Sequence, residues 1–189
     1  MLEKYFKNAS EKFAKPFVLV LARFRIKPNT VSILGLIIVL LGSYFFYVDN
    51  KFLGIILIFL GSAVDGLDGP YARYQNLVSE RGAVLDSFID RLGELFIWSV
   101  VAIGFTSNDI ELFIVLSILV ASNLIPYIRA KSESYGITNK AGITARPERV
   151  IFAVLYMYFD FSFNFVYLFA LLTWFTVFQR FYKLYISVE

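Results

Sequence analysis

The sequence predicts an all-α integral membrane protein, with six transmembrane helices preceded by an N-terminal amphipathic interfacial helix. Of the 189 residues, 58% are hydrophobic, whereas soluble domains are about 45–50% apolar. Residues 31–47 and 52–64 contain no charged side chain, and apolar runs of roughly 20 residues are typical of helices that cross a bilayer. A chain of this length cannot surround several such helices with polar structure, which argues against a soluble fold.

The first 27 residues are expected to form an amphipathic helix along the membrane interface. Lysines at positions 4, 7, 12 and 15 alternate with aromatic and aliphatic side chains, a pattern typical of interfacial helices. The run Lys27-Pro28-Asn29-Thr30 interrupts this pattern, and proline is favoured at the first position of a helix. We therefore expect two regions, a juxtamembrane helix over residues 1–27 and one membrane domain over residues 28–189.

Six apolar runs define the spans of this membrane domain. The turn Asp49-Asn50-Lys51 separates the first two, and a short polar link over residues 75–81 makes the second and third an antiparallel hairpin. A longer polar segment, residues 132–149, precedes the last two. The spans are expected at about residues 31–48, 52–74, 82–105, 110–131, 150–159 and 163–186.

The basic residues predict the orientation of the chain. An even number of spans places both termini, the second-to-third loop and the fourth-to-fifth loop on one side. Nearly all lysines and arginines outside the spans fall on that side, and Lys51 is the one lysine or arginine on the other. Because cytoplasmic loops carry the excess of basic residues, we expect a multi-pass protein of the cell membrane with cytoplasmic termini. This bias also accounts for the net charge of +3 without a nucleic-acid partner.

Four aspartates within the second and third spans are the main chemical signal. Asp65 and Asp68 are three residues apart and Asp86 and Asp90 four apart, so each pair shares one helix face. In the hairpin, Asp65 lies at the depth of Asp90, and Asp68 at the depth of Asp86. A carboxylate at the centre of a membrane helix costs at least about 2.5–3.5 kcal/mol, so four together require compensating cations. We expect two divalent ions to balance these four charges, with all four aspartates as metal ligands.

The chain contains neither histidine nor cysteine, so the metal site must be built from oxygen. Oxygen ligands suit hard cations, and we expect Mg²⁺ or Mn²⁺. One alternative is a set of salt bridges from Arg73 and Arg91, although two arginines cannot neutralise this many carboxylates. Glu94, one turn beyond Asp90, is expected to order Asp90 or to pair with Arg73 or Arg91. A cation-coupled transporter is the alternative of a different class, but it predicts internal repeats, and the sequence has no evident ones.

The residues around the aspartates form a motif, DxxDGxxAR followed after eight residues by GxxxDxxxD, between Asp65 and Asp90. This motif resembles the signature of the CDP-alcohol phosphatidyltransferase family, with every fixed position present. Small residues let a planar nucleotide approach the helix backbone, and an arginine can hold phosphate oxygens bidentately. The resemblance, which includes the Pro-Asn pair before the first span, implies a nucleotide site made by Asn29, Thr30, Asp65, Gly69, Ala72, Arg73 and Gly82.

The resemblance also implies a reaction. The donor is CDP-diacylglycerol or CDP-archaeol, an alcohol hydroxyl attacks the lipid-side phosphorus, and CMP leaves. Asp90 is expected to take the hydroxyl proton and to be the catalytic residue, in addition to its place among the metal ligands. The active site is expected to face the cytoplasm, and the family resemblance implies a homodimer in the lipid bilayer.

Basic residues near the ends of the last three spans indicate the acceptor. They resemble the inositol-phosphate branch of the family, the phosphatidylinositol and archaetidylinositol phosphate synthases, in which a basic pocket is expected to hold the acceptor phosphate. Glycerol phosphate or another alcohol remains the alternative acceptor, and positive-inside bias is the alternative explanation of the charges. The candidate phosphate-binding residues are Arg129, Lys131, Arg146, Arg149 and Arg180.

Overall fold

The computed structural model describes residues 14–24, 26–159 and 161–188, and this part of the chain is helical with no strand. Residues 14–23 form a helical segment, in which Ala14 and Val18 pack against Val31 and Tyr71. Most of the predicted amphipathic helix, including Lys4, lies outside the described residues. The amphipathic character predicted for residues 1–27 therefore stays a prediction.

Helices α2 (Pro28–Tyr47) and α3 (Lys51–Asp65) form a tightly packed hairpin. Glycines on both helices allow the backbones to touch. A Cβ atom built on Gly61 would lie 2.7 Å from the carbonyl oxygen of Gly35, and one built on Gly54 would lie 2.6 Å from the backbone nitrogen of Phe46. Small residues of this kind replace side-chain interdigitation where membrane helices approach closely.

The second predicted span is divided into two helices. Helix α3 ends at Asp65, and α4 (Asp68–Tyr74) begins after a break at Gly66 and Leu67. Pro70 has no backbone N–H to donate to the carbonyl of Gly66, and proline is tolerated only in the first turn of a helix. The break places Asp65 at the end of one helix and Asp68 at the start of the next.

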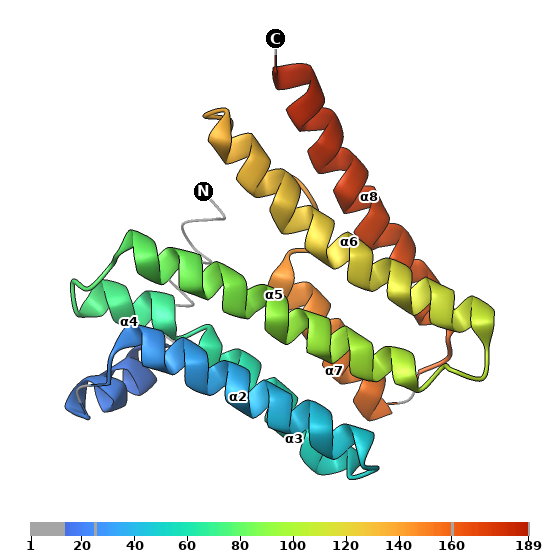
Figure 1. The fold of residues 1–189 in the computed structure, drawn as a ribbon, viewed down its shortest axis with the longest axis horizontal. Helices are drawn as coiled ribbons and strands as arrows, with labels where there is room; N and C mark the ends of the chain where they lie inside the picture. The colour runs from blue at the N-terminus through green and yellow to red at the C-terminus, as the bar shows by residue number, and fades with distance from the viewer. Residues whose placement is uncertain (1–13, 25, 160, 189) are drawn as a thin grey trace.

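The remaining helices are α5 (Glu80–Ile103), α6 (Asp109–Ser134), α7 (Arg146–Phe159) and α8 (Asn164–Ser187). Two of them begin with a side-chain cap. The Oγ of Ser79 accepts a hydrogen bond from the backbone of Gly82 at 3.1 Å, and Oδ1 of Asn108 accepts one from Glu111 at 3.2 Å. Figure 1 shows α6 and α8 running side by side. Helices α5 and α7 lie between this pair and the α2–α3 hairpin.

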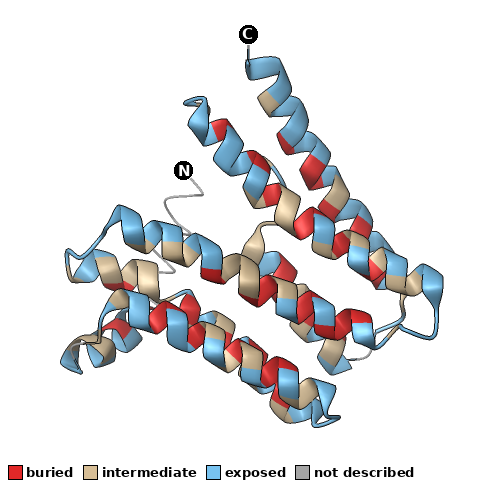
Figure 2. Ribbon diagram, viewed as in Figure 1, coloured by how far each residue is buried: buried red, intermediate tan, exposed pale blue. Residues whose placement is uncertain are grey.

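Aromatic stacking joins α5, α7 and α8 in the main hydrophobic cluster. Trp98 of α5 stacks on Phe169 of α8 at 5.9 Å between ring centroids, and Phe169 stacks on Phe152 of α7 at 3.9 Å. Ile58 of α3 and Ile118 of α6 are fully buried in the same cluster. In Figure 2 the buried residues line the contacts between helices, and the exposed ones cover the outer faces.

Among the described residues, four helical stretches are long and apolar enough to cross a membrane, and their outer faces carry large exposed apolar side chains such as Phe113 and Leu171. The protein is therefore a membrane protein, but the structure does not confirm a count of six spans. Helix α5 has 24 residues but carries the charged residues of the predicted site, and α7 has 14. At 1.5 Å per residue α7 is about 21 Å long, which is shorter than a hydrocarbon core of about 30 Å. The four stretches are Pro28–Tyr47, Lys51–Tyr74, Asp109–Ser134 and Asn164–Ser187.

Candidate active site

Three of the four predicted aspartates converge on one point. Carboxylate oxygens of Asp65, Asp68 and Asp86 all lie within 4.8 Å of one another. Asp65 is 2% exposed, and its Oδ1 accepts no hydrogen bond from any described residue. Asp68 is held by the Ser32 hydroxyl and by the backbone N–H of Gly69. Three converging carboxylates with a buried, unpaired oxygen fit a divalent cation, which prefers oxygen ligands. We call this group the carboxylate cluster.

The fourth aspartate, Asp90, lies one turn further along α5 and is bound by an arginine. Nη1 of Arg146 forms an ion pair with Oδ1 of Asp90, and Nη2 of Arg146 donates a hydrogen bond to Oδ2 of Asp65 at 2.7 Å. One guanidinium therefore bridges Asp65 and Asp90, as the antiparallel arrangement of α3 and α5 allows. Among the described residues, Asp90 stands outside the carboxylate cluster.

One cavity of about 300 Å³ lies between α4 and the start of α5. Asp68 and Asp86 form one wall, so this α4–α5 cavity opens onto the carboxylate cluster. A Cβ atom on Gly82 would lie 3.3 Å from the amide oxygen of Asn29, so a side chain there would narrow the cavity. The predicted nucleotide residues that line it are Asn29, Gly69, Ala72, Arg73 and Gly82.

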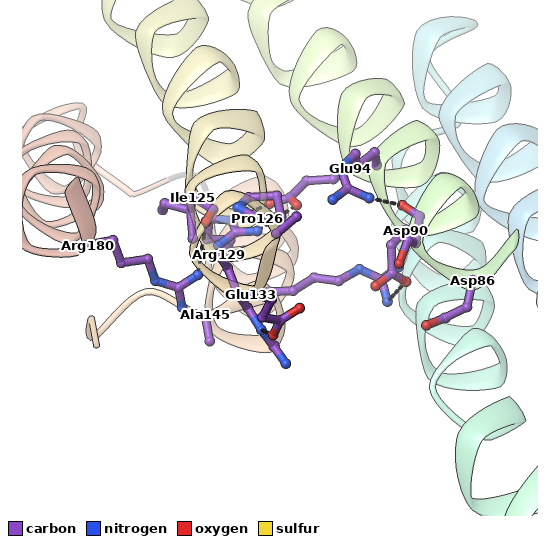
Figure 3. Close-up of a pocket in the computed structure, with 14 residues that line it drawn as sticks. Asp86, Asp90, Glu94, Ile125, Pro126, Arg129, Glu133, Ala145 and Arg180 are labelled. Atoms are coloured by element: carbon purple, nitrogen blue, oxygen red, sulfur yellow. Dashed lines mark hydrogen bonds and ion pairs between the residues drawn. The ribbon is translucent and has the colours of Figure 1, made fainter. Parts of the chain in front are cut away.

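A second cavity, of about 310 Å³, lies between α5, α6 and the start of α7, and several arginines line it (Figure 3). Asp86 and Asp90 form its wall on the α5 side. Because Asp86 lines both cavities, the carboxylate cluster stands between the α4–α5 cavity and this arginine-lined cavity. The arginines are Arg91, Arg129, Arg146, Arg149 and Arg180.

A family model for CDP-alcohol phosphatidyltransferases matches residues 25–181, which include both cavities and the carboxylate cluster. The chain belongs to the CDP-alcohol phosphatidyltransferase family. It is therefore an enzyme that transfers phosphatidyl groups, and the family predicted from the aspartate motif is confirmed.

Named relatives and solved structures agree with this family. The chain is 37% identical over 164 residues to an archaetidylinositol phosphate synthase from Pyrococcus horikoshii, covering 86% of each chain. Its fold is similar to the Mycobacterium tuberculosis phosphatidylinositol phosphate synthase with CDP-DAG bound, with a TM-score of 0.80, 27% identity, and coverage of 92% of this chain and 94% of that one. A second structure of the M. tuberculosis enzyme, in complex with manganese and citrate, has a TM-score of 0.80 at 26% identity and covers 91% and 88% of the two chains.

Three residues predicted for this phosphatidyltransferase's substrates lie outside the two cavities. Thr30 is on the first turn of α2, and Asp65 is buried behind the α4–α5 cavity within the carboxylate cluster. Lys131 lines a separate groove beside α8, where its ammonium lies 5.0 Å from the centroid of the Tyr135 ring. The structure does not bring Lys131 together with the four predicted arginines.

Two of those arginines hold the phosphatidyltransferase fold together. The guanidinium of Arg149 donates through Nε and Nη2 to the carboxylate of Glu94 and through Nη1 to the carbonyl of Thr144, and both charged side chains are buried. The partner of Glu94 is therefore Arg149, where Arg73 or Arg91 was expected, and an effect of Glu94 on Asp90 stays a prediction. Arg180 donates to the carbonyls of Ala141 and Ile125, at 2.7 and 3.0 Å, and joins the loop before α7 to α6.

Sequence reasoning missed three features of the site. Ser32 binds Asp68 across 36 residues of sequence, and Arg146 reaches Asp65 across 81. Glu133 lines the arginine-lined cavity and pairs with Arg129 at 2.9 Å. The i to i+4 spacing of Glu133 from Arg129 was a readable signal, whereas the two long-range contacts have no local signature.

Proposed function

We propose that this phosphatidyltransferase moves a phosphatidyl or archaetidyl group from a CDP-linked lipid to inositol phosphate and releases CMP. The observation that supports this most directly is the position of the carboxylate cluster, with Asp86 shared by the α4–α5 cavity and the arginine-lined cavity. A phosphorylated acceptor needs several guanidinium groups, and the second cavity supplies them. The names of the relatives in Pyrococcus and Mycobacterium favour the same acceptor.

The α4–α5 cavity is the proposed site of the CDP moiety. Gly69, Ala72 and Gly82 leave room for a planar base and ribose against the helix backbones. Arg73, which lies in the last turn of α4 and lines this cavity, is the proposed ligand of the phosphate oxygens. Asn29 and Thr30 at the start of α2 remain proposed nucleotide contacts, with Asn29 lining the cavity.

Asp65, Asp68 and Asp86 would hold the divalent cation, Mg²⁺ or Mn²⁺. When bound, the cation neutralises the charge on the phosphate oxygens of the donor. Asp90 lies on the acceptor side of the cluster and is the proposed base. The acceptor hydroxyl oxygen bonds to the lipid-side phosphorus, the phosphorus–oxygen bond to CMP breaks, and the hydroxyl proton passes to the Asp90 carboxylate. The proposed second ion would use Asp90 as a ligand and requires the Arg146–Asp90 ion pair to open.

The predicted domain organisation and topology belong to this proposal. Residues 28–189 form the six-helix domain, in which α5 and α7 also cross or enter the cell membrane, with both termini and the active site on the cytoplasmic side. The basic residues outside the spans support this orientation. We also propose a homodimer, on family resemblance and on the exposed apolar faces of α6 and α8.

Acceptor profiling tests the proposed function. The purified enzyme is incubated with CDP-archaeol or CDP-diacylglycerol and Mg²⁺ or Mn²⁺, and CMP release is measured with inositol phosphate, glycerol phosphate, serine and free inositol. We expect release that depends on inositol phosphate. Release with glycerol phosphate alone would reassign the acceptor, and ion flux in vesicles without CMP release from any acceptor would favour the transporter.

A further inference from the structure

Arg146 belongs to two parts of the active site at once. Its side chain lines the arginine-lined cavity, yet its two terminal nitrogens contact Asp65 and Asp90. It is 25% exposed, and its Nε is buried without a hydrogen-bond partner among the described residues. This guanidinium is therefore held by carboxylates on one side and faces the cavity on the other.

The other arginines of this cavity are held differently. Arg149 is bound by Glu94, Arg180 by backbone carbonyls, and Arg129 by Glu133. The Nη1 of Arg91 contacts the carbonyl of Ser87 on its own helix. Among the described arginines that line the cavity, Arg146 is the one that binds the carboxylate cluster, through its hydrogen bond to Asp65.

The position of Arg146 conflicts with a cation at the carboxylate cluster. Its Nη2 donates a hydrogen bond to Oδ2 of Asp65 at 2.7 Å. A divalent ion bound to Asp65 would therefore lie next to the positive charge of this guanidinium. Like charges at such short range repel strongly where burial excludes water. A bound cation therefore favours a rotation of the Arg146 side chain away from Asp65.

The arginine-lined cavity has room for the displaced guanidinium. A tetrahedral dianion there would receive two parallel hydrogen bonds from it. The backbone of α7 stays fixed, because the buried pair of Glu94 and Arg149 fastens its first turn to α5. The movement is thus confined to the Arg146 side chain.

We propose that Arg146 couples cation binding at the carboxylate cluster to anion binding in the arginine-lined cavity. Either ligand favours the guanidinium turned into the cavity, so each raises the affinity for the other. By linkage the two effects are equal in size. This inference rests on the proposed metal and acceptor sites, and it adds that the empty acceptor cavity weakens the metal site.

Mn²⁺ binding to the detergent-solubilised full chain tests the coupling, with free Mn²⁺ measured by electron paramagnetic resonance. Sulfate serves as the tetrahedral dianion, and chloride at equal ionic strength is the control. We expect sulfate to raise the Mn²⁺ affinity of the wild type about fivefold or more, within the range of typical coupling factors. In R146Q the affinity without sulfate is expected to rise about tenfold, and sulfate is expected to add less than about twofold.

The sign of the R146Q effect separates coupling from a merely structural role, in which loss of Arg146 would disorder Asp65 and weaken Mn²⁺ binding. The matched control is R129Q, which removes an equal charge from the same cavity without touching Asp65, and its Mn²⁺ affinity without sulfate should rise far less than that of R146Q. Unchanged or weaker Mn²⁺ binding by R146Q would overturn the coupling. A Mn²⁺ affinity of the wild-type protein that does not change with sulfate would overturn it as well. A wild type that binds no Mn²⁺ would overturn the metal site itself.

Discussion

The backbone of Gly35 lies against the side chain of Asp65, so that a Cβ atom built on Gly35 would be 2.8 Å from the Cβ atom of Asp65. Real Cβ atoms do not approach this closely. Helix α2 therefore sets the position of a carboxylate that belongs to α3, and the hydroxyl of Ser32 on the same helix fixes Asp68. The close packing of the α2–α3 hairpin is in this way part of the active site.

Replacing Gly35 by alanine should damage the metal site as well as the fold. Because the new methyl group must displace Asp65, we expect Mn²⁺ affinity to fall at least about tenfold, with an overpacking cost of about 1–3 kcal/mol. Titration with Mn²⁺ and thermal unfolding measure the two effects. Gly93→Ala is the matched control, since its Cβ atom would meet Leu36 at an ordinary 3.9 Å. Equal behaviour of the two variants would show that Gly35 does not position Asp65.

Asp90→Asn should separate chemistry from nucleotide binding. The amide keeps the shape of the side chain but cannot take a proton from the acceptor, and loss of a general base typically costs about 10²–10⁴-fold in rate. We expect CMP release to fall by that range while CDP binding, measured by calorimetry, stays within about twofold. Near-normal turnover in this variant would show that another group accepts the proton.

The buried pair of Glu94 and Arg149 should matter for stability more than for acceptor affinity. Removal of one partner leaves an unpaired buried charge, which typically costs about 3–5 kcal/mol. We expect Arg149→Met to lower the thermal midpoint strongly, and the double variant with Glu94→Leu to recover part of the loss. A stable Arg149→Met protein with a raised KM for inositol phosphate would instead place Arg149 in direct contact with the acceptor.

Arg129 and Lys131 should differ in their effect on the acceptor, although they are two residues apart. Arg129 lines the arginine-lined cavity, whereas Lys131 faces a separate groove. We expect Arg129→Gln to raise the KM for inositol phosphate about tenfold, as loss of a charge-assisted hydrogen bond does, and Lys131→Gln to change it less than about twofold. Steady-state kinetics with varied acceptor measure both, and a larger effect of Lys131→Gln would contradict the placement of the groove.

Local patterns predicted most of the helices because each depends on nearby residues. Apolar runs gave the helices within a few residues of their ends. The spacing of the four aspartates predicted a convergence that the structure shows for Asp65, Asp68 and Asp86, whereas Asp90 pairs with Arg146. The division between α3 and α4 was missed, because residues 52–74 were predicted as one span although the charge-free run ends at Val64 and Pro70 follows it. The number of spans cannot be counted from helix length alone, because α5 carries charged residues of the site. In addition, α7 is shorter than a membrane-spanning helix.

Partners of buried charges could not be predicted, because they depend on the packing of distant helices. Arg149 and Glu94 are 55 residues apart, and nothing in either segment indicates the other. The resemblance to the inositol-phosphate branch of the family placed Arg146 among the acceptor-binding residues. Its contact with Asp65 and Asp90 arises only when the start of α7 packs beside α3 and α5.

The most direct measurement is the stoichiometry of products from CDP-archaeol and inositol phosphate, with CMP quantified by chromatography and the lipid by mass spectrometry. The account predicts equal amounts of CMP and archaetidylinositol phosphate from the wild type, and neither from Asp86→Asn, which alters the carboxylate shared by the two cavities. CMP formed without the phosphoinositide lipid, or an undiminished yield from Asp86→Asn, would contradict it.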